Sequence, residues 1–282
     1  MSIRIEHVSD TALLVAASRA LESERADGLI RDPFAARLAG DRGMALLKSV
    51  PIPQWVELGI GLRTRLLDEL LAIALQNGAD SVFSLGAGLD ARPWRLKLAG
   101  DLQWTEVDFP EILDYKYSLL EGAAPHCYLE RRSADLNNES ERRRVIADAI
   151  SGGRHPVLIS EGLLMYLPAE TVRALAVEAR QAGFPYWLLD TSSPGLLRRA
   201  HGDALEQINR VRAESHLEGP QIRQVIELQG WKPFERRLFV EEAPKLAHER
   251  ILKIIEAEGR PAEPPENDGS GVWLYCPDFE AE

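Results

Sequence analysis

Apolar residues in the first quarter of the chain follow a helical pattern. Between residues 9 and 76 they recur at spacings of three and four, as at Leu14, Ala17 and Leu21. Prolines at Pro33 and within 51–53 predict breaks, and a further helix is expected over 54–76. We therefore expect a helical region at 1–77.

From residue 78 onward, short apolar strands alternate with helices, which is typical of parallel βαβ units. The predicted strands are 81–85, 103–107, 127–131, 157–160 and 186–190, and the predicted helices between them are 93–98, 110–120, 139–150 and 169–182. Since crossovers between parallel strands are right-handed, this order predicts a doubly wound α/β sheet domain over 78–282.

A polar, charged stretch at 191–219 interrupts the alternation. It contains Ser192-Ser193-Pro194-Gly195, and we expect a helical insertion that closes over the sheet edge as a lid. The elements predicted after it are a helix at 221–228, a strand at 234–240, a helix at 243–256 and a last strand at 272–276.

Composition excludes several protein classes. The 282 residues are 45% hydrophobic and 27% charged, as in a soluble globular protein. The net charge of −11 argues against nucleic acid or an anionic membrane as partner. Cys127 and Cys276 have no neighbours at metal-ligand spacing, and no stretch reaches the roughly 18 apolar residues of a membrane span. We therefore expect a cytoplasmic protein without a metal site, whose partner is a small molecule.

A glycine-rich turn follows the first predicted strand, in the run Ser84-Leu85-Gly86-Ala87-Gly88-Leu89-Asp90-Ala91. Glycines at 86 and 88 allow positive φ and the close approach of a ligand to the backbone. This is where a doubly wound sheet cradles a nucleotide. The alternative is an ordinary strand-to-helix turn in which Asp90 caps the helix.

An acidic residue, Asp108, ends the next predicted strand twenty residues beyond Gly88. An acid in this position binds ribose hydroxyls, although Asp108 also suits a helix cap ahead of Pro110. Dinucleotides and S-adenosylmethionine both use this geometry. Asp90 would repel a diphosphate and tolerate a sulfonium, so the loop favours S-adenosylmethionine.

Four short motifs stand in a fixed order along the chain. They are Leu62-Arg63-Thr64-Arg65, residues 86–92, Glu106-Val107-Asp108, and residues 160–167 with the sequence SEGLLMYL. Together with 11–20 and 32–35, they resemble the leucine carboxyl methyltransferase-like family. This family includes bacterial O-methyltransferases linked to polyketide metabolism. The resemblance spans roughly the first two thirds of the chain and fades after Thr191, so it does not specify the methyl acceptor.

The resemblance implies a class I methyltransferase fold. Such a fold has a mostly parallel, seven-stranded Rossmann-like sheet with an antiparallel last strand, and here a helical region closes over S-adenosylmethionine. In the family, the residue matching Arg63 contacts the carboxylate of the cofactor, and the residue matching Asp108 contacts its ribose. The residue matching Asp135 lies by the adenine, and the residue matching Glu161 lies near the methionine end. The expected cofactor-binding residues are Arg63, Gly86, Ala87, Gly88, Asp90, Asp108, Asp135, Leu136 and Glu161.

One position departs from the usual pattern, because Ser84 stands where many class I methyltransferases have an acid. We therefore expect backbone carbonyls or Glu161 to bind the ammonium group. Glu161 follows a strand at the ligand-binding end of the sheet, which packing alone does not explain.

Other residues allow a structural role as well. Arg63 could instead pair with Asp68 or Glu69, and Asp135 could serve only in a turn. Tyr166 and Met165 suit a core position equally well.

The predicted activity is S-adenosylmethionine-dependent O-methylation of a carboxylate or hydroxyl oxygen on a small acidic or phenolic metabolite. A carboxylate needs no base, whereas a phenol or alcohol benefits from one. The candidate catalytic residues are Glu161, His201, His216 and Asp190. The alternatives are an NAD(P)-dependent oxidoreductase, for which the chain lacks an evident Tyr-x-x-x-Lys pair, a protein C-terminal carboxyl methyltransferase and a binding module without activity.

Overall fold

The computed structural model describes residues 8–49, 54–191, 216–258 and 269–278. At its centre a seven-stranded sheet has the strand order β3-β2-β1-β4-β5-β7-β6. The strands are β1 (Ser81–Leu85), β2 (Gln103–Asp108), β3 (Tyr128–Ser133), β4 (Pro156–Ser160), β5 (Tyr186–Thr191), β6 (Trp231–Leu238) and β7 (Gly271–Pro277). Strands β1 to β5 pair in parallel, and β7 runs antiparallel to both β5 and β6. The predicted fold class is confirmed, including the antiparallel last strand.

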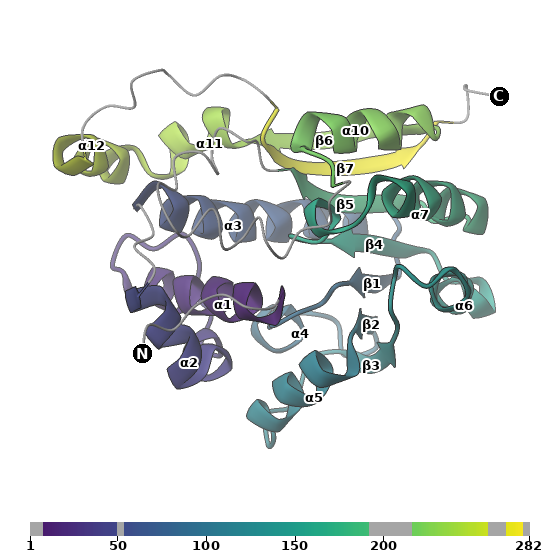
Figure 1. Cartoon of the computed structure of the whole chain (residues 1–282), viewed down its shortest axis with the longest axis horizontal. Coiled ribbons are helices and arrows are strands. Elements are labelled where there is room, and N and C mark those ends of the chain that lie inside the picture. Colours follow the sequence, from purple (N-terminus) through teal and green to yellow (C-terminus); the bar gives the residue numbers. More distant parts are fainter. Residues whose placement is uncertain (1–7, 50–53, 192–215, 259–268, 279–282) are drawn as a thin grey trace.

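Helices cover both faces of this sheet and one end of it (Figure 1). Three precede the sheet: α1 (Val8–Glu24), α2 (Ala35–Ser49) and α3 (Gln54–Gln76). The others are α4 (Arg92–Arg95), α5 (Pro110–Leu119), α6 (Glu139–Ala149), α7 (Ala169–Ala182), α10 (Gly219–Leu228), α11 (Phe239–Leu246) and α12 (His248–Glu258), with short 3₁₀ turns η1 (Ser151–Gly153) and η2 (Leu164–Tyr166).

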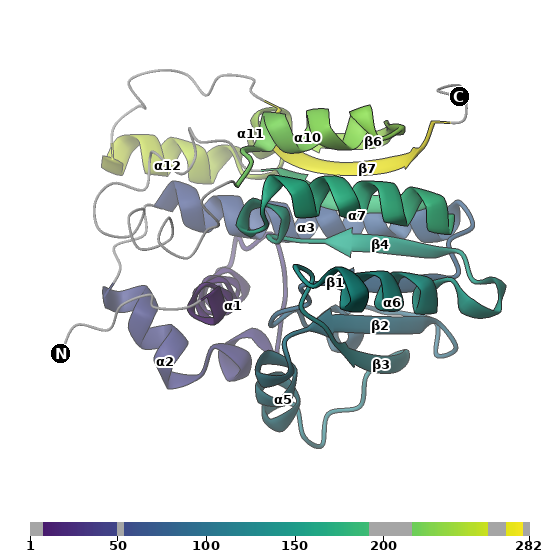
Figure 2. The same cartoon turned by 45° about the vertical axis from the view of Figure 1, so that its right-hand side comes forward.

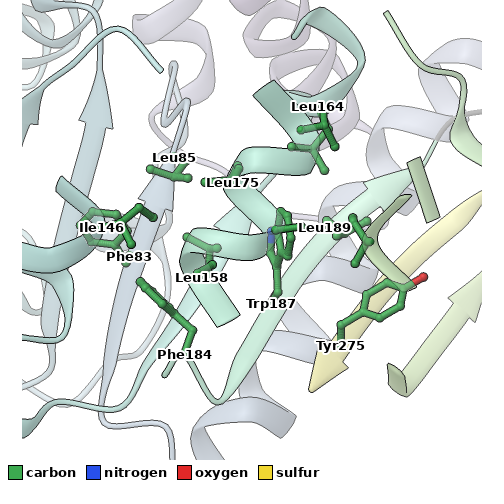
Figure 3. Packing of buried hydrophobic residues seen from close by; sticks show 14 of the residues in the cluster. Phe83, Leu85, Ile146, Leu158, Leu164, Leu175, Phe184, Trp187, Leu189 and Tyr275 are labelled. Carbon is green, nitrogen blue, oxygen red and sulfur yellow. The ribbon is translucent and has the colours of Figure 1, made fainter. Parts of the chain in front are cut away.

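Alternate residues of the central strands enter two separate cores. Phe83, Leu158 and Trp187 pack with α6, α7 and α10 on one face, as Figure 3 shows. Their neighbours Val82 and Val157 pack against α3 on the other face. Because both faces are buried, these strands are rich in apolar residues and do not alternate with exposed polar ones, as expected for a parallel sheet.

Helices α1 and α2 lie beyond the carboxyl ends of the parallel strands (Figure 2). Leu13 and Ala17 of α1 share a core with Leu38 of α2 and with Leu89, which follows β1. At the other end of α1, the buried Arg250 of α12 donates a hydrogen bond of 2.6 Å to Glu22. The amino-terminal helices are thereby attached to the sheet domain at the end where ligands bind in such folds.

Three predicted elements differ from the structure. Strand β6 begins at Trp231 rather than at 234, and Val240 belongs to α11. As an edge strand, β6 accommodates Pro233 and alternates little in burial, so its pattern is weak. The predicted helix at 243–256 is two helices, and the one at 93–98 ends at Arg95.

The predicted lid at 191–219 lies outside the described residues except at its two ends. Thr191 ends β5, and Gly219 is the first residue of α10. Ahead of Gly219, the backbone N–H of Glu218 donates to Gln221 in a capping box. In the described part of the chain, no helix is long and apolar enough to cross a membrane.

Candidate active site

A cavity opens at the carboxyl ends of β1, β2 and β4, where the strand order reverses between β1 and β4. This is the position at which open α/β sheets bind their ligands. Its walls are formed by Thr11, Ala12, Val15, Arg19, Arg63, Ser84, Gly86, Ala87, Gly88, Leu89, Asp90, Asp108, Phe109, Ile112, Glu161, Gly162, Leu163, Met165 and Tyr166.

The glycine-rich turn forms the floor of the cavity and is held against the end of β2. Gly86 and Gly88 have φ of 59° and 46°, a region that side chains disfavour. A Cβ atom on Gly86 would lie 2.8 Å from a methyl group of Leu163. The backbone N–H of Gly88 donates a hydrogen bond of 2.7 Å to Asp108 Oδ2, so turn and carboxylate form one unit.

Asp108 faces this turn rather than the helix that follows it. Its Oδ1 accepts from the N–H of the adjacent Phe109 at 2.7 Å, and Phe109 itself is the cap residue of α5. Burial raises the pKa of Asp108 despite these two hydrogen bonds. Each carboxylate oxygen keeps a lone pair with which to accept a ligand hydroxyl.

Glu161 lies between two arginines at the opposite wall. Arg92 Nη1 donates to Glu161 Oε2 at 2.6 Å, and Arg63 Nη2 lies 3.1 Å from Glu161 Oε1. Burial disfavours the charged carboxylate, but Arg92 and then Arg63 outweigh it and lower the pKa of Glu161 to about 2. Glu161 is therefore ionised at neutral pH.

Behind Arg63 and Arg92, a buried ionic network joins the turn to α3 and β5. Arg92 also contacts Asp90 at 2.9 Å and Asp68 at 2.6 Å, and Arg63 reaches Asp190 at 3.5 Å. Burial of Asp90 is likewise outweighed by Arg92, and the pKa of Asp90 is lowered. For Asp190 burial prevails over the charge of Arg63, and the pKa is raised.

The comparison with known protein families decides the identity of this site. A family model described as leucine carboxyl methyltransferase matches residues 12–179. The chain belongs to the leucine carboxyl methyltransferase family. Since the family consists of S-adenosylmethionine-dependent methyltransferases, the chain is one of these enzymes and S-adenosylmethionine is its cofactor. The oxidoreductase alternative is thereby wrong.

Relatives and solved structures agree with this membership in the leucine carboxyl methyltransferase family. A Streptomyces coelicolor protein is 38% identical over 177 residues, covering 58% of this chain and 62% of its own length. A Frankia alni protein is 36% identical over 208 residues, covering 69% and 72%. Both are named as proposed S-adenosyl-L-methionine-dependent methyltransferases.

Two solved structures share the fold at low sequence identity. One is a DUF574 family protein from Streptomyces avermitilis, with TM-score 0.55, 14% identity and coverage of 93% of this chain and 96% of that one. The other is a proposed methyltransferase from Thermobifida fusca, with TM-score 0.50, 20% identity and coverage of 95% and 94%.

Most of the cofactor-binding residues expected from the sequence meet in this one cavity of the methyltransferase. They are Arg63, Gly86, Ala87, Gly88, Asp90, Asp108 and Glu161. The structural alternative for Arg63 is wrong, because Asp68 pairs with Arg92 and Arg95 and Glu69 pairs with Arg65. Asp90 also acts within its turn, accepting from the N–H of Arg92 at 3.0 Å.

Asp135 and Leu136 do not line the cavity. Asp135 Oδ1 accepts from the N–H of Asn137 at 2.9 Å, which is an Asx turn ahead of α6. Leu136 is buried in the core beside α6. Their contact with adenine stays a prediction.

Among the catalytic candidates that the structure describes, only Glu161 lines the cavity. Asp190 lies behind it and accepts from the N–H of Gly162 at 2.6 Å. His216 forms an isolated backbone bridge with Pro168 and is not part of the cavity wall. His201 lies outside the described residues.

The sequence predicted that residues 1–77 cover the site, but it did not single out the individual residues of α1, or Arg92. Ala12, Val15 and Arg19 line the cavity from one face of α1, and their spacing of three and four was the available signal. Arg19 donates to the carbonyl of Leu89 at 2.7 Å, which ties α1 to the glycine-rich turn. Arg92 is entirely inside the protein and was not distinguishable from a solvated arginine.

The residues present fit S-adenosylmethionine. Glu161 Oε1 and Arg63 Nε are buried polar atoms without a hydrogen-bond partner in the described part of the chain. A carboxylate and a guanidinium, each with one polar atom that makes no hydrogen bond, suit the ammonium and carboxylate groups of an amino acid. Asp108, on the other side of the turn, suits a ribose diol.

Proposed function

We propose that the enzyme transfers the methyl group of S-adenosylmethionine to an oxygen atom, carboxylate or hydroxyl, of a small acceptor. The observation that carries the proposal is one cavity holding Arg63 and Glu161 at one wall and Asp108 at another, across the glycine-rich turn. Oxygen as the acceptor atom is supported by the family description, which names carboxyl methylation. The apolar wall formed by Val15, Ile112 and Met165 favours a small organic molecule over a charged macromolecule.

In this proposal the polar residues bind and orient the cofactor. Arg63 holds its carboxylate, Glu161 binds its ammonium group in place of an acid at Ser84, and Asp108 holds its ribose hydroxyls. Asp135 and Leu136 would lie at the adenine end.

The chemistry needs little beyond positioning and exclusion of water. S-adenosylmethionine supplies an electrophilic methyl group on a positively charged sulfur. Helix α1 and the turn form part of the cavity wall, and the ionised carboxylates of Asp90 and Glu161 lie there with Arg63. No histidine is found among the described residues that line it. A carboxylate acceptor would not require one.

Replacing Arg63 by alanine is expected to raise the dissociation constant of S-adenosylmethionine about tenfold, because a charge-assisted hydrogen bond to the carboxylate is lost. Methylthioadenosine lacks that carboxylate, so its affinity should change much less. Calorimetric titration of both ligands measures the difference.

Arg65→Ala is the matched control for this experiment. Arg65 lies two residues further along α3 and pairs with Glu69 at the surface, 2.9 Å away. Its removal should leave both affinities unchanged. Equal losses of both ligands in Arg63→Ala would show that Arg63 acts through packing of α3 instead.

The acceptor is sought by incubating the enzyme with methyl-labelled cofactor and a panel of small carboxylic acids, phenols and alcohols. Label in a base-labile ester identifies a carboxylate acceptor, and label in a stable ether identifies a hydroxyl. Transfer to nitrogen, sulfur or carbon, or to a protein carboxyl terminus only, would contradict the proposal.

A further inference from the structure

A single buried arginine joins three parts of the fold behind the cavity. The side chain of Arg92 is 1% exposed. It contacts Asp68 of α3, Asp90 of the glycine-rich turn and Glu161 after β4, at 2.6, 2.9 and 2.6 Å. Arg92 does not itself line the cavity, but Asp90 and Glu161 do.

The two carboxylate oxygens of Glu161 differ in their hydrogen bonding. Oε2 accepts the hydrogen bond from Arg92, while Oε1 is buried, lacks a hydrogen-bond partner in the described residues and lies 3.1 Å from Arg63 Nη2. Arg63 compensates the charge of Oε1 but makes no hydrogen bond to it, so this oxygen can still accept a hydrogen bond from a ligand at the cavity wall.

We propose that Arg92 is a positioning residue for the cofactor: its hydrogen bond to Oε2 turns Glu161 so that Oε1 receives the ammonium group. This inference rests on the proposed function. Arg92 is not among the residues that line the cavity, so it acts on the cofactor through the residues it contacts there, of which Glu161 is the one expected at the ammonium group.

The charges around Glu161 show why Arg92 matters most. The groups that act on it from the surrounding elements are Arg19 of α1, Arg63 of α3, Asp90 of the turn, Arg92 of α4 and Asp190 of β5. Without Arg92, Glu161 would face two carboxylates, and Arg63 would be shared with Asp190. Burial would then raise the pKa of Glu161 toward neutrality.

The experiment compares the wild-type enzyme with Arg92→Met and Arg92→Lys by calorimetry of S-adenosylmethionine, from about pH 5.5 to 7.5. Titrations in two buffers of different ionisation enthalpy report the protons released on binding. The ionisable groups of S-adenosylmethionine titrate in the same way with the wild-type enzyme and with each variant. A difference between two pH profiles therefore reports on the protein.

Arg95→Met is the matched control. Arg95 lies on the same short helix, is buried and pairs with Asp68 through both terminal nitrogens at 2.6 and 2.8 Å, but has no contact with Glu161. Arg95→Met therefore removes a buried ion pair but leaves the contact between Arg92 and Glu161 in place.

In the wild-type enzyme and in Arg95→Met, we expect an affinity that changes little over this range and no proton release. In Arg92→Met, affinity should fall about tenfold at pH 7.5 and further at pH 5.5, with release of a proton as Glu161 ionises on binding. Arg92→Lys retains the charge and should restore the flat profile.

A uniform loss of affinity in Arg92→Met, parallel to the wild-type profile, would overturn the inference. So would a pH-dependent profile in Arg92→Lys, which keeps the test decisive if the methionine variant does not fold. Failure of the wild-type enzyme to bind S-adenosylmethionine would instead reject the proposed function itself.

Discussion

Replacing Asp108 by alanine is expected to raise the dissociation constant of S-adenosylmethionine by about tenfold to a hundredfold. Charge-assisted hydrogen bonds of this kind contribute about 1.5 to 3 kcal/mol. The substitution also removes the acceptor for the N–H of Gly88, which holds the turn at the end of β2. Calorimetric titration of a folded variant measures the change.

Asp108→Asn keeps one acceptor oxygen and the same shape, so its affinity should lie between those of the alanine variant and the wild-type enzyme. Asp114→Ala is the control, because Asp114 is an exposed acid on α5 that does not line the cavity, and its removal should leave the affinity unchanged. Unchanged affinity in Asp108→Ala would reduce Asp108 to a structural role in the turn.

Lys116→Met is expected to lower the free energy of unfolding by about 3 to 5 kcal/mol at pH 8, since it leaves a buried carboxylate without its counter-charge. Lys116 and Glu106 are almost wholly buried, 2.6 Å apart. Burial raises the pKa of Glu106, and Lys116 opposes that shift. Without Lys116 the pKa rises further. Urea denaturation measures the stability of the variant.

The loss of stability in Lys116→Met should depend on pH. A carboxyl whose folded-state pKa is raised holds its proton more tightly when folded, so stability falls as pH rises from the usual value toward the folded one. Relative to the wild-type enzyme, the variant should therefore lose less free energy of unfolding at pH 5 than at pH 8. Adding Glu106→Gln should recover much of the loss at pH 8, whereas a deficit equal at both pH values would contradict this explanation.

The sequence predicted the central sheet well and its edge poorly, for a physical reason. Strands β1 and β4 are buried on both faces, and burial favours the short runs of apolar residues that mark them in the sequence. In β6 only Trp231 and Leu238 are buried, and the charged residues between them carry no such signal. The division into 1–77 and 78–282 stays a prediction, although α1 does contribute to the cavity wall.

Within the site, the sequence indicated residues whose type is dictated locally. Gly86 is required by its positive φ, and Asp108 and Glu161 end strands at the ligand-binding edge. The partners of these residues were not predictable. Arg92 meets Asp68 and Glu161 across separations of 24 and 69 residues, and only the folded chain shows which charges meet.

The buried pair of Glu22 and Arg250 constrains how this enzyme could be recombined with its relatives. Glu22 also accepts from the N–H of Leu29 at 2.7 Å, so one carboxylate holds α1, the following loop and α12 together. A chimaera that takes its first helices from one relative and its carboxyl-terminal region from another would separate these partners. Exchanging α1 together with α12 keeps the two charges together, so such hybrids should fold more readily than those that exchange one helix alone.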